Sequence, residues 1–488
     1  MKTIISCYIK TIAPVHIGCG EIYEPTSFII NENTQELIAF DRLTFAATLT
    51  NPEKQTLKQI CLKGNIGSIV ALNNFIRNKH VEGQSVALCK GFLTHYQQKI
   101  RDLNPNNEKE IIKEFNRFEI SRTAWCQKDH RPYIPGSAMK GAIRTAYLNA
   151  MQFKQKLKKE KNAQQLEKKL LHYQKLESDP FRLIKVSDFM PVGKVSTNIV
   201  YAVNEKKMPT KHAAGGPYQI LEVITPGAIF KGNICVEFPQ SKNDQYITSD
   251  ALLNAIETFY YREKLREDGE LIRLGFKKPE KPLKEKLLRM GRHSGAESIT
   301  IEGHRNIKIM RGRGERPDYK EHATTLWLAS EERMPTNKTT LKPFGWVSFH
   351  ELTSQQSAQL DEQEDNYQIQ ALAAQKAKKA QKEKAREERL AKEQRAAEKA
   401  REAEEQQRIQ EEYKIKLAAM SPEEQDLEKL KNPNVIEHEV VKIYQKLDDY
   451  PENFQTQIAS GLKEYWIKQN KWKKKGLQQK TVGKGSRG

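Results

Sequence analysis

The chain has 488 residues, of which 38% are hydrophobic and 30% charged, and its formal net charge at pH 7 is +20. This length suffices for two or three domains with cores of their own, but so large a charged fraction argues against one compact globule. The surplus of Lys and Arg favours a polyanionic partner. Nucleic acid is the first candidate and an anionic membrane surface the second. The alternative is a basic protein without a specific partner.

Cysteine usage and hydropathy narrow the class of protein further. The six cysteines are scattered without a CxxC pair, so we expect neither a zinc site nor a disulfide framework, and the thiols should be reduced. No apolar run reaches the roughly eighteen residues that a membrane helix needs. The first residues lead into a strand-like segment rather than a signal peptide. We therefore expect a cytoplasmic protein with no metal, no other cofactor and no membrane partner.

The N-terminal segment predicts a strand followed by a glycine-containing loop. Residues 3–12 alternate as a strand does, and residues 14–20 read PVHIGCG. Gly18 and Gly20 would let a ligand approach the backbone closely. His16 is a candidate contact for that ligand, although a lone histidine among apolar neighbours is more often a core residue.

Residues 133–146, YIPGSAMKGAIRTA, predict the end of a strand, a tight turn and a helix. Ser137 is expected to cap the helix, because its hydroxyl can accept from a first-turn N–H. Lys140 and Arg144 lie four residues apart and share one helix face. Together with Gly136 and the free N–H groups of the helix start, these cations form a candidate phosphate site. A structural turn before a solvated helix face is the alternative, and composition does not decide between them.

A second β-rich block begins near residue 181 and continues with strand patterns at 219–224 and 228–236 and an amphipathic helix at 250–261. Strands that alternate with helices twice predict an α+β fold with two ferredoxin-like modules. We expect the first module over residues 1–180 and the second over residues 181–352.

Residues 287–295 predict a strand that runs into a loop with two glycines and two arginines. Backbone N–H and guanidinium groups in such a loop suit successive phosphates, whereas an ordinary basic β-hairpin is the alternative. Trp346 could stack on a base, but core packing is the preferred interpretation. The candidate RNA contacts in this part of the chain are Arg289, Gly291, Arg292, Ser294, Gly295, Arg311 and Arg313.

The C-terminal third has a different composition. Residues 351–421 contain neither Gly nor Pro, which favours a long charged helix, expected as a spacer over residues 353–420. Few leucines recur at heptad spacing, so a coiled coil is not expected. Ser421, Pro422 and Glu424 form a capping signature, which predicts a small helical domain over residues 421–475. Residues 476–488 are expected to be a disordered basic tail.

Residues 135–144, PGSAMKGAIR, resemble the PGSSLKGAIR-type signature of the RAMP proteins, which are the RNA-binding subunits of type III CRISPR effector complexes. Further landmarks agree in order: TIAPVHIGCGE at 11–21, DPFR at 179–182, VSD at 186–188, RMGRHSGAES at 289–298 and KPFGWV at 342–347. The resemblance covers residues 1–350. It is greatest to the subunits of type III-A (Csm) complexes that cap the crRNA at its 3-prime end.

This resemblance implies a fold of two RRM-like ferredoxin modules. It also implies a non-catalytic, crRNA-binding subunit of a ribonucleoprotein that serves antiviral defence. The capping subunit of such a complex supports crRNA maturation. The resemblance implies crRNA and the neighbouring RAMP subunits of the Csm complex as partners, with host ribonucleases as further candidates. It also implies that a glycine-rich loop contacts the crRNA backbone. The residues assigned to RNA binding are His16, Gly18, Gly20, Gly136, Ser137, Lys140, Arg144, Arg289, Gly291, Arg292, Ser294, Gly295, Arg311 and Arg313.

Two other functions stay open at this point. The sequence has no Walker motif, HExxH or nucleophile elbow, and its aspartates are too isolated to suggest a two-metal nuclease. His16, His130, His293 and His304 could still serve as acid and base in a metal-independent endoribonuclease that processes crRNA precursors. The other alternative is a scaffold that acts through its C-terminal helix.

Overall fold

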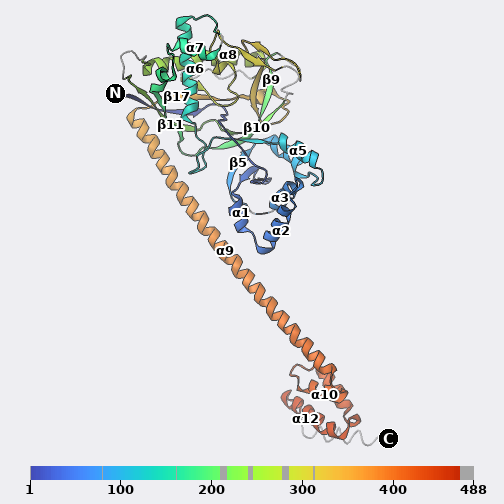
Figure 1. Cartoon of the computed structure of the whole chain (residues 1–488). Helices are drawn as coiled ribbons and strands as arrows, with labels where there is room; N and C mark the ends of the chain where they lie inside the picture. The colour runs from blue at the N-terminus through green and yellow to red at the C-terminus, as the bar shows by residue number, and fades with distance from the viewer. Residues whose placement is uncertain are drawn as a thin grey trace. The chain divides into compact units, whose positions relative to one another are not determined.

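The computed structural model describes residues 2–77, 79, 81–160, 162–208, 217–239, 246–276, 285–310 and 314–472. The chain divides into two compact units, residues 1–372 and residues 373–488. The first unit is a mixture of strands and helices, and the second is helical (Figure 1). The predicted α+β class, followed by a long charged helix and a small helical domain, is confirmed.

One sheet of the first unit, called the first sheet here, is antiparallel and has the order β12–β17–β1–β11–β7. Its strands are β1 (Lys2–Thr11), β7 (Ile184–Val186), β11 (Ile229–Glu237), β12 (Lys286–Arg289) and β17 (Trp346–Glu351), and β8 (Met190–Pro191) pairs with β11. Helices α6 (Gly136–Gln155) and α8 (Ser249–Arg273) alternate with these strands along the chain. The arrangement is that of a ferredoxin-like unit in which β17 is the fourth strand and β12 is added at the edge.

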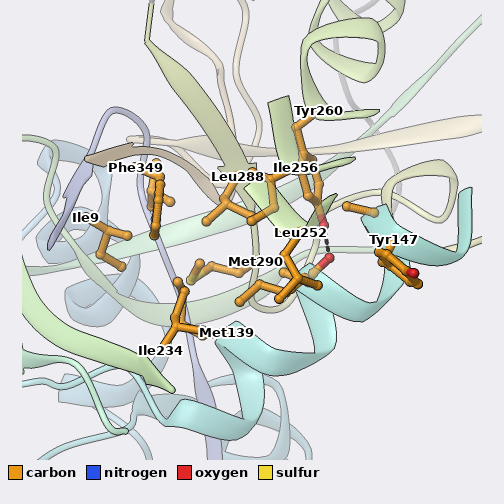
Figure 2. Close-up of a cluster of buried hydrophobic side chains, with 14 of the residues drawn as sticks. Ile9, Met139, Tyr147, Ile234, Leu252, Ile256, Tyr260, Leu288, Met290 and Phe349 are labelled. Atoms are coloured by element: carbon orange, nitrogen blue, oxygen red, sulfur yellow. Dashed lines mark hydrogen bonds between the residues drawn. The ribbon is translucent and has the colours of Figure 1, made fainter. Parts of the chain in front are cut away.

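Alternation along the strands builds the core of this sheet. Ile9 on β1 pairs with Phe230 on one side and Phe349 on the other, and all three side chains are buried. Met139 from α6 and Ile256 from α8 pack into the same cluster (Figure 2). The hydroxyl of Tyr260 on α8 donates to the carbonyl of Ala142 on α6 at 3.1 Å, so the two helices are joined directly.

The other large sheet, called the second sheet here, has the order β2–β6–β10–β9–β5–β4–β3, and β15 and β16 extend from β9. Its strands are β2 (Gly18–Ile22), β3 (Phe28–Asn31), β4 (Glu36–Ala39), β5 (Gln84–Leu88), β6 (Ile120–Thr123), β9 (Thr197–Lys206), β10 (Gln219–Ile224), β15 (Thr325–Ser330) and β16 (Lys342–Pro343). Both sheets take strands from either side of residue 180, where the sequence predicts a module boundary. The predicted domain boundaries stay predictions.

Shorter elements complete the first unit. The helices α1 (Arg42–Thr48), α2 (Asn51–Leu62), α3 (Gly67–Arg77), α4 (Lys90–Tyr96) and α5 (Glu108–Arg117) lie between strands of the second sheet in sequence, and α7 (Ala163–Leu170) follows α6. Strands β13 (Ile307–Ile309) and β14 (Asp318–Lys320) form a separate hairpin. Leu271 and Leu274 near the end of α8 belong to the core of the second sheet, so this helix contributes to both cores.

Helix α9 (Ser354–Ala418) begins in the first unit and continues into the second. The helices α10 (Pro422–Lys431), α11 (Glu437–Gln445) and α12 (Glu452–Lys468) bury a small core that includes Val440 and Ile458. Ser421 caps α10, and its capping box with Glu424 confirms the signature in the sequence. The tail predicted over residues 476–488 lies outside the described residues.

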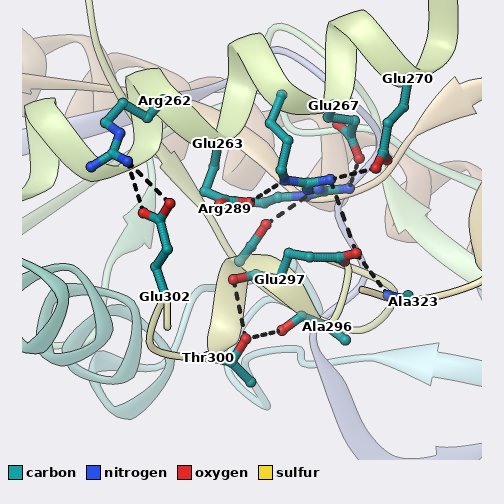
Figure 3. Close-up of polar contacts among 12 residues, drawn as sticks. Arg262, Glu263, Glu267, Glu270, Arg289, Ala296, Glu297, Thr300, Glu302 and Ala323 are labelled. Carbon is teal, nitrogen blue, oxygen red and sulfur yellow. Dashed lines mark hydrogen bonds and ion pairs between the residues drawn. The ribbon is translucent and has the colours of Figure 1, made fainter. Parts of the chain in front are cut away.

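A network of buried charges joins α8 to the last residue of β12 and to the segment that follows it (Figure 3). The Nη2 atom of Arg289 lies 2.6 Å from the Oε1 atom of Glu267, and both side chains are at most 2% exposed. Trp346 donates from Nε1 to the other carboxylate oxygen of Glu267 at 2.6 Å. One turn earlier on α8, Glu263 pairs with the buried Arg305 at 2.6 Å. Because an unpaired charge is costly in a protein interior, these pairs fix α8 against the chain around residues 289–305.

We expect Arg289→Ala to lower the free energy of unfolding by about 3–5 kcal/mol, because it leaves the carboxylate of Glu267 buried without its counter-ion. Urea unfolding followed by tryptophan fluorescence measures the change. The matched control is Arg262→Ala on the same helix, which removes an exposed pair with Glu302 and should cost less than about 1 kcal/mol. Equal effects of the two substitutions would contradict the structural role of the buried pair.

Candidate nucleic-acid interface

Two glycine-containing segments that are far apart in the sequence meet in the structure. The backbone N–H of Arg292 donates to the carbonyl of His16 at 2.9 Å, and that of Gly345 donates to the carbonyl of Pro14 at 2.9 Å. Gly291 has a φ of 84°, and a Cβ atom there would lie 2.4 Å from the His16 oxygen. Only glycine fits this contact, so the structure brings together the predicted loops at 14–20 and 289–295.

Of the two histidines in these loops, one is buried and the other, His293, is partly buried. His16 is fully buried, and its Nδ1 lies 2.7 Å from the carbonyl oxygen of Glu222, so Nδ1 carries the proton. Burial is the main cause that lowers its pKa. Burial is the main cause that lowers the pKa of His293 to about 3, and the charge of Arg292 and the neighbouring His16 act in the same direction. Both imidazoles are therefore neutral at pH 7.

Other members of the predicted loop serve its own structure. The guanidinium of Arg289 belongs to the buried network and also donates to the carbonyl of Phe344 at 3.0 Å. Ser294 is buried and its hydroxyl donates to the carbonyl of Gly291, while Gly295 adjoins the Arg289 guanidinium. Arg292 is exposed and forms no ion pair within the described part of the chain. Arg311 and Arg313 lie outside the described residues.

Helix α6 starts differently from what its sequence predicts. Pro135 is the N-cap and the helix begins at Gly136, so the prediction that Ser137 caps it is wrong, and Ser137 is an exposed first-turn residue. The reason is a carboxylate distant in sequence, since Asp188 accepts from the N–H of Gly136 at 2.7 Å. A Cβ atom at Gly136 would lie 2.3 Å from the carbonyl oxygen of Val186. The positive end of the helix is therefore already offset by one acidic side chain.

The two cations predicted to share a face of α6 have different surroundings. Arg144 is 2.7 Å from Glu167 and 3.0 Å from Asp179, so its charge is neutralised inside the unit. Lys140 forms no ion pair among the described residues. Partial burial is the main cause that lowers its pKa, followed by the positive charge of Lys185, while Asp179 acts in the opposite direction. Lys140 therefore stands beside a like charge.

Lys185 is a residue that the sequence reasoning missed. It is exposed on β7, between the buried Ile184 and the partly buried Val186, and it has no ion-pair partner in the parts of the chain that are described. The alternation of this short strand was the available signal, because it directs Lys185 away from the core. The charge of Lys185 lowers the pKa of Lys140, so the two ammonium groups repel each other, and a bound anion would relieve that repulsion. We call Lys140 and Lys185 the lysine pair.

Gly18 and Gly20 lie on β2, an exposed strand at the end of the second sheet. Gly20 has a φ of 82°, and no atom lies within 4 Å of the position that a Cβ would take. The backbone is thus open to a ligand at this edge. The described hydrogen bonds and ion pairs do not connect residues 136–144 directly with residues 14–20 or 289–295, but Ile17, Met139 and Met290 from these three segments share the core of the first sheet.

Within the described residues, His, Cys, Asp and Glu do not gather in any group of three or more that could hold a metal ion. Across the same residues, no helix has the length and apolar character needed to span a membrane.

A family model for the RAMP superfamily matches residues 8–288. Among solved structures, a chain of a Csm–crRNA–target RNA ternary complex from a type III-A CRISPR-Cas system is similar at 18% identity with a TM-score of 0.47, covering 71% of this chain and 100% of that chain. Csm5 of T. onnurineus is similar at 17% identity with a TM-score of 0.41, covering 70% and 99%. The search of curated proteins finds no match.

The low pKa of His293 predicts a pH dependence of stability. The unfolded imidazole binds a proton near its ordinary pKa of 6.5, whereas the folded one does so only near a pKa of about 3. Protonation of this histidine therefore has no effect on the free energy of unfolding above pH 6.5, and it lowers that free energy progressively as the pH falls from 6.5 toward 3. Asn tolerates the left-handed backbone at this residue (φ 63°). We expect His293→Asn to make the free energy of unfolding less dependent on pH in this range, by up to about 1.4 kcal/mol per pH unit. Urea unfolding at several pH values tests this, and an unchanged slope would contradict it.

Proposed function

We propose that this chain, which belongs to the RAMP superfamily, is a non-catalytic crRNA-binding subunit of a type III-A CRISPR effector complex. It would cap the crRNA at its 3-prime end, pack against neighbouring RAMP subunits of the Csm complex and support crRNA maturation in the cytoplasm. The ordered landmarks over residues 1–350 support the assignment to the capping position.

The observation that carries the binding proposal is the lysine pair at the start of α6. Lys140, near the start of α6, and Lys185, on β7, form no ion pair within the described chain, and the charge of Lys185 lowers the pKa of Lys140 more than Asp179 raises it. The exposed Arg292 and the open glycine edge of β2 supply further contacts of the same type. A ribose-phosphate strand carries regularly spaced negative phosphates, which can pair with several such cations at once. Binding should therefore be largely independent of RNA sequence.

The surroundings of the histidines support binding without cleavage. Metal-free RNA cleavage needs one group that donates a proton and one that accepts it at the working pH. His16 is fully buried, and His293 has a pKa of about 3, so neither supplies the protonated acid at pH 7. In this proposal the imidazoles attach the two glycine loops to β10, because His16 donates to the carbonyl of Glu222 and Nε2 of His293 lies 3.0 Å from Oε1 of Gln219.

We expect the double substitution Lys140→Ala with Lys185→Ala to lower crRNA affinity several-fold at moderate salt and to reduce the slope of log K against log salt by about 1–2. Fluorescence anisotropy of labelled RNA at several salt concentrations measures both. The control is Lys169→Ala with Arg262→Ala, which removes the same charge from two exposed cations that are already paired. An equal loss in the two variants would show that only net charge matters, and would refute the site.

Incubation of the purified chain with a repeat-containing transcript should yield no site-specific cleavage, because neither His16 nor His293, the histidines of the two glycine loops, provides an acid at neutral pH. Denaturing gels of end-labelled RNA provide the readout. Cuts that disappear in His16→Ala or His293→Ala would instead favour the metal-independent endoribonuclease.

A further inference from the structure

The first turns of α9 are fixed against the first unit rather than free in solvent. The Nη2 atom of Arg131 lies 2.5 Å from Oε1 of Glu364, and the N–H of Gly193 donates to the other oxygen of that carboxylate at 2.7 Å. Lys231 on β11 pairs with Asp361 at 2.6 Å. The Arg131 side chain is only 10% exposed. These contacts set the rotation of the helix about its axis and therefore which face it turns toward residues 193–194.

That face borders a cleft of about 490 Å³. Gln359, Gln363, Asn366 and Gln370 line it at spacings of four, three and four residues, which places their amides in one row along the helix. Within the described chain none of these four amides has a hydrogen-bond partner. The row spans about 17 Å at the rise of an α-helix. We call this feature the amide cleft.

Two further side chains complete the lining. Tyr367 faces the same cleft, and its ring lies 4.9 Å from the guanidinium of Arg131, which holds the aromatic side chain in place. Lys194 is an exposed cation opposite the helix, and Glu362 is the carboxylate among the lining residues. The lining therefore combines uncharged donors and acceptors with one aromatic ring and a balanced pair of charges.

We infer that the amide cleft binds unpaired nucleobases of the RNA that this chain holds, an inference that rests on the proposed function. Each carboxamide presents a donor and an acceptor in one plane, which matches the paired donor and acceptor on the edge of a base such as adenine. A tyrosine beside the row can stack on a base, and Lys194 can meet the adjoining phosphate. The lysine pair binds phosphates, whereas this cleft reads uncharged base edges.

The lining argues against a protein occupant. Protein partners dock through aromatic or aliphatic anchors that fill apolar pockets. The described residues that line the amide cleft include no aliphatic side chain, and their carboxamides would lose hydrogen bonds to water without replacement beneath an apolar anchor. An unpaired base replaces those hydrogen bonds with its own.

The test compares two RNAs of equal length on the full chain, a single-stranded adenine-rich RNA and its abasic counterpart. We expect Gln363→Ala with Asn366→Ala to weaken binding of the base-bearing RNA about tenfold and to leave binding of the abasic RNA unchanged. The control, Gln375→Ala with Gln381→Ala, removes two exposed amides of the same helix outside the cleft and should change neither affinity.

Each outcome separates this inference from the function on which it rests. Unchanged binding by the Gln363 and Asn366 variant, or an equal loss on both RNAs, would overturn the inference. If the unaltered chain binds both RNAs equally and in a salt-dependent manner, the inference falls while the proposed function stands. If it binds neither RNA, both fall together.

Discussion

The buried pair between Arg289 and Glu267 is the interaction on which the candidate interface depends. Both groups are almost completely buried, so each requires the other, and the pair holds the end of β12 against α8. The glycine loop begins at the next residues. Gly291 can then pass against the carbonyl of His16, and the backbone of Arg292 reaches that same oxygen. A charge pair in the core thus fixes a backbone conformation at the surface.

The basic residues of the first unit fall into two groups with different consequences. Arg144, Arg289 and Arg305 are neutralised by carboxylates of the chain itself, and their guanidinium groups hold elements together. Lys140 and Lys185 form no ion pair among the residues that the structure describes, and in the proposed function their charge serves a ligand. A net charge of +20 does not distinguish the two groups. Removing a cation of the first group should chiefly cost stability, whereas removing one of the second should chiefly cost binding.

Local signals in the sequence were sufficient for some features and insufficient for others. Alternation predicted β1, and the capping signature at Ser421 predicted the start of α10, because both depend on residues close in the chain. The cap of α6 was wrong because Asp188, distant in sequence, takes the first N–H. Arg144 looked free for the same reason, since Glu167 and Asp179 are not neighbours in sequence. The pairing of β1 with β11 and β17 likewise depends on contacts that spacing does not reveal.

Helix α9 shows how one element can combine two kinds of surface. Most of its length carries mixed charges exposed to solvent, as a spacer would. Its first turns differ, because Asp361 and Glu364 are used for anchoring, whereas the amides of Gln359, Gln363, Asn366 and Gln370 line a cleft. Contacts to phosphates alone hold every RNA sequence equally well. A row of amides in addition to such contacts would make the affinity for a flexible RNA strand depend on its bases, because carboxamides form hydrogen bonds with base edges and phosphate contacts do not involve the bases.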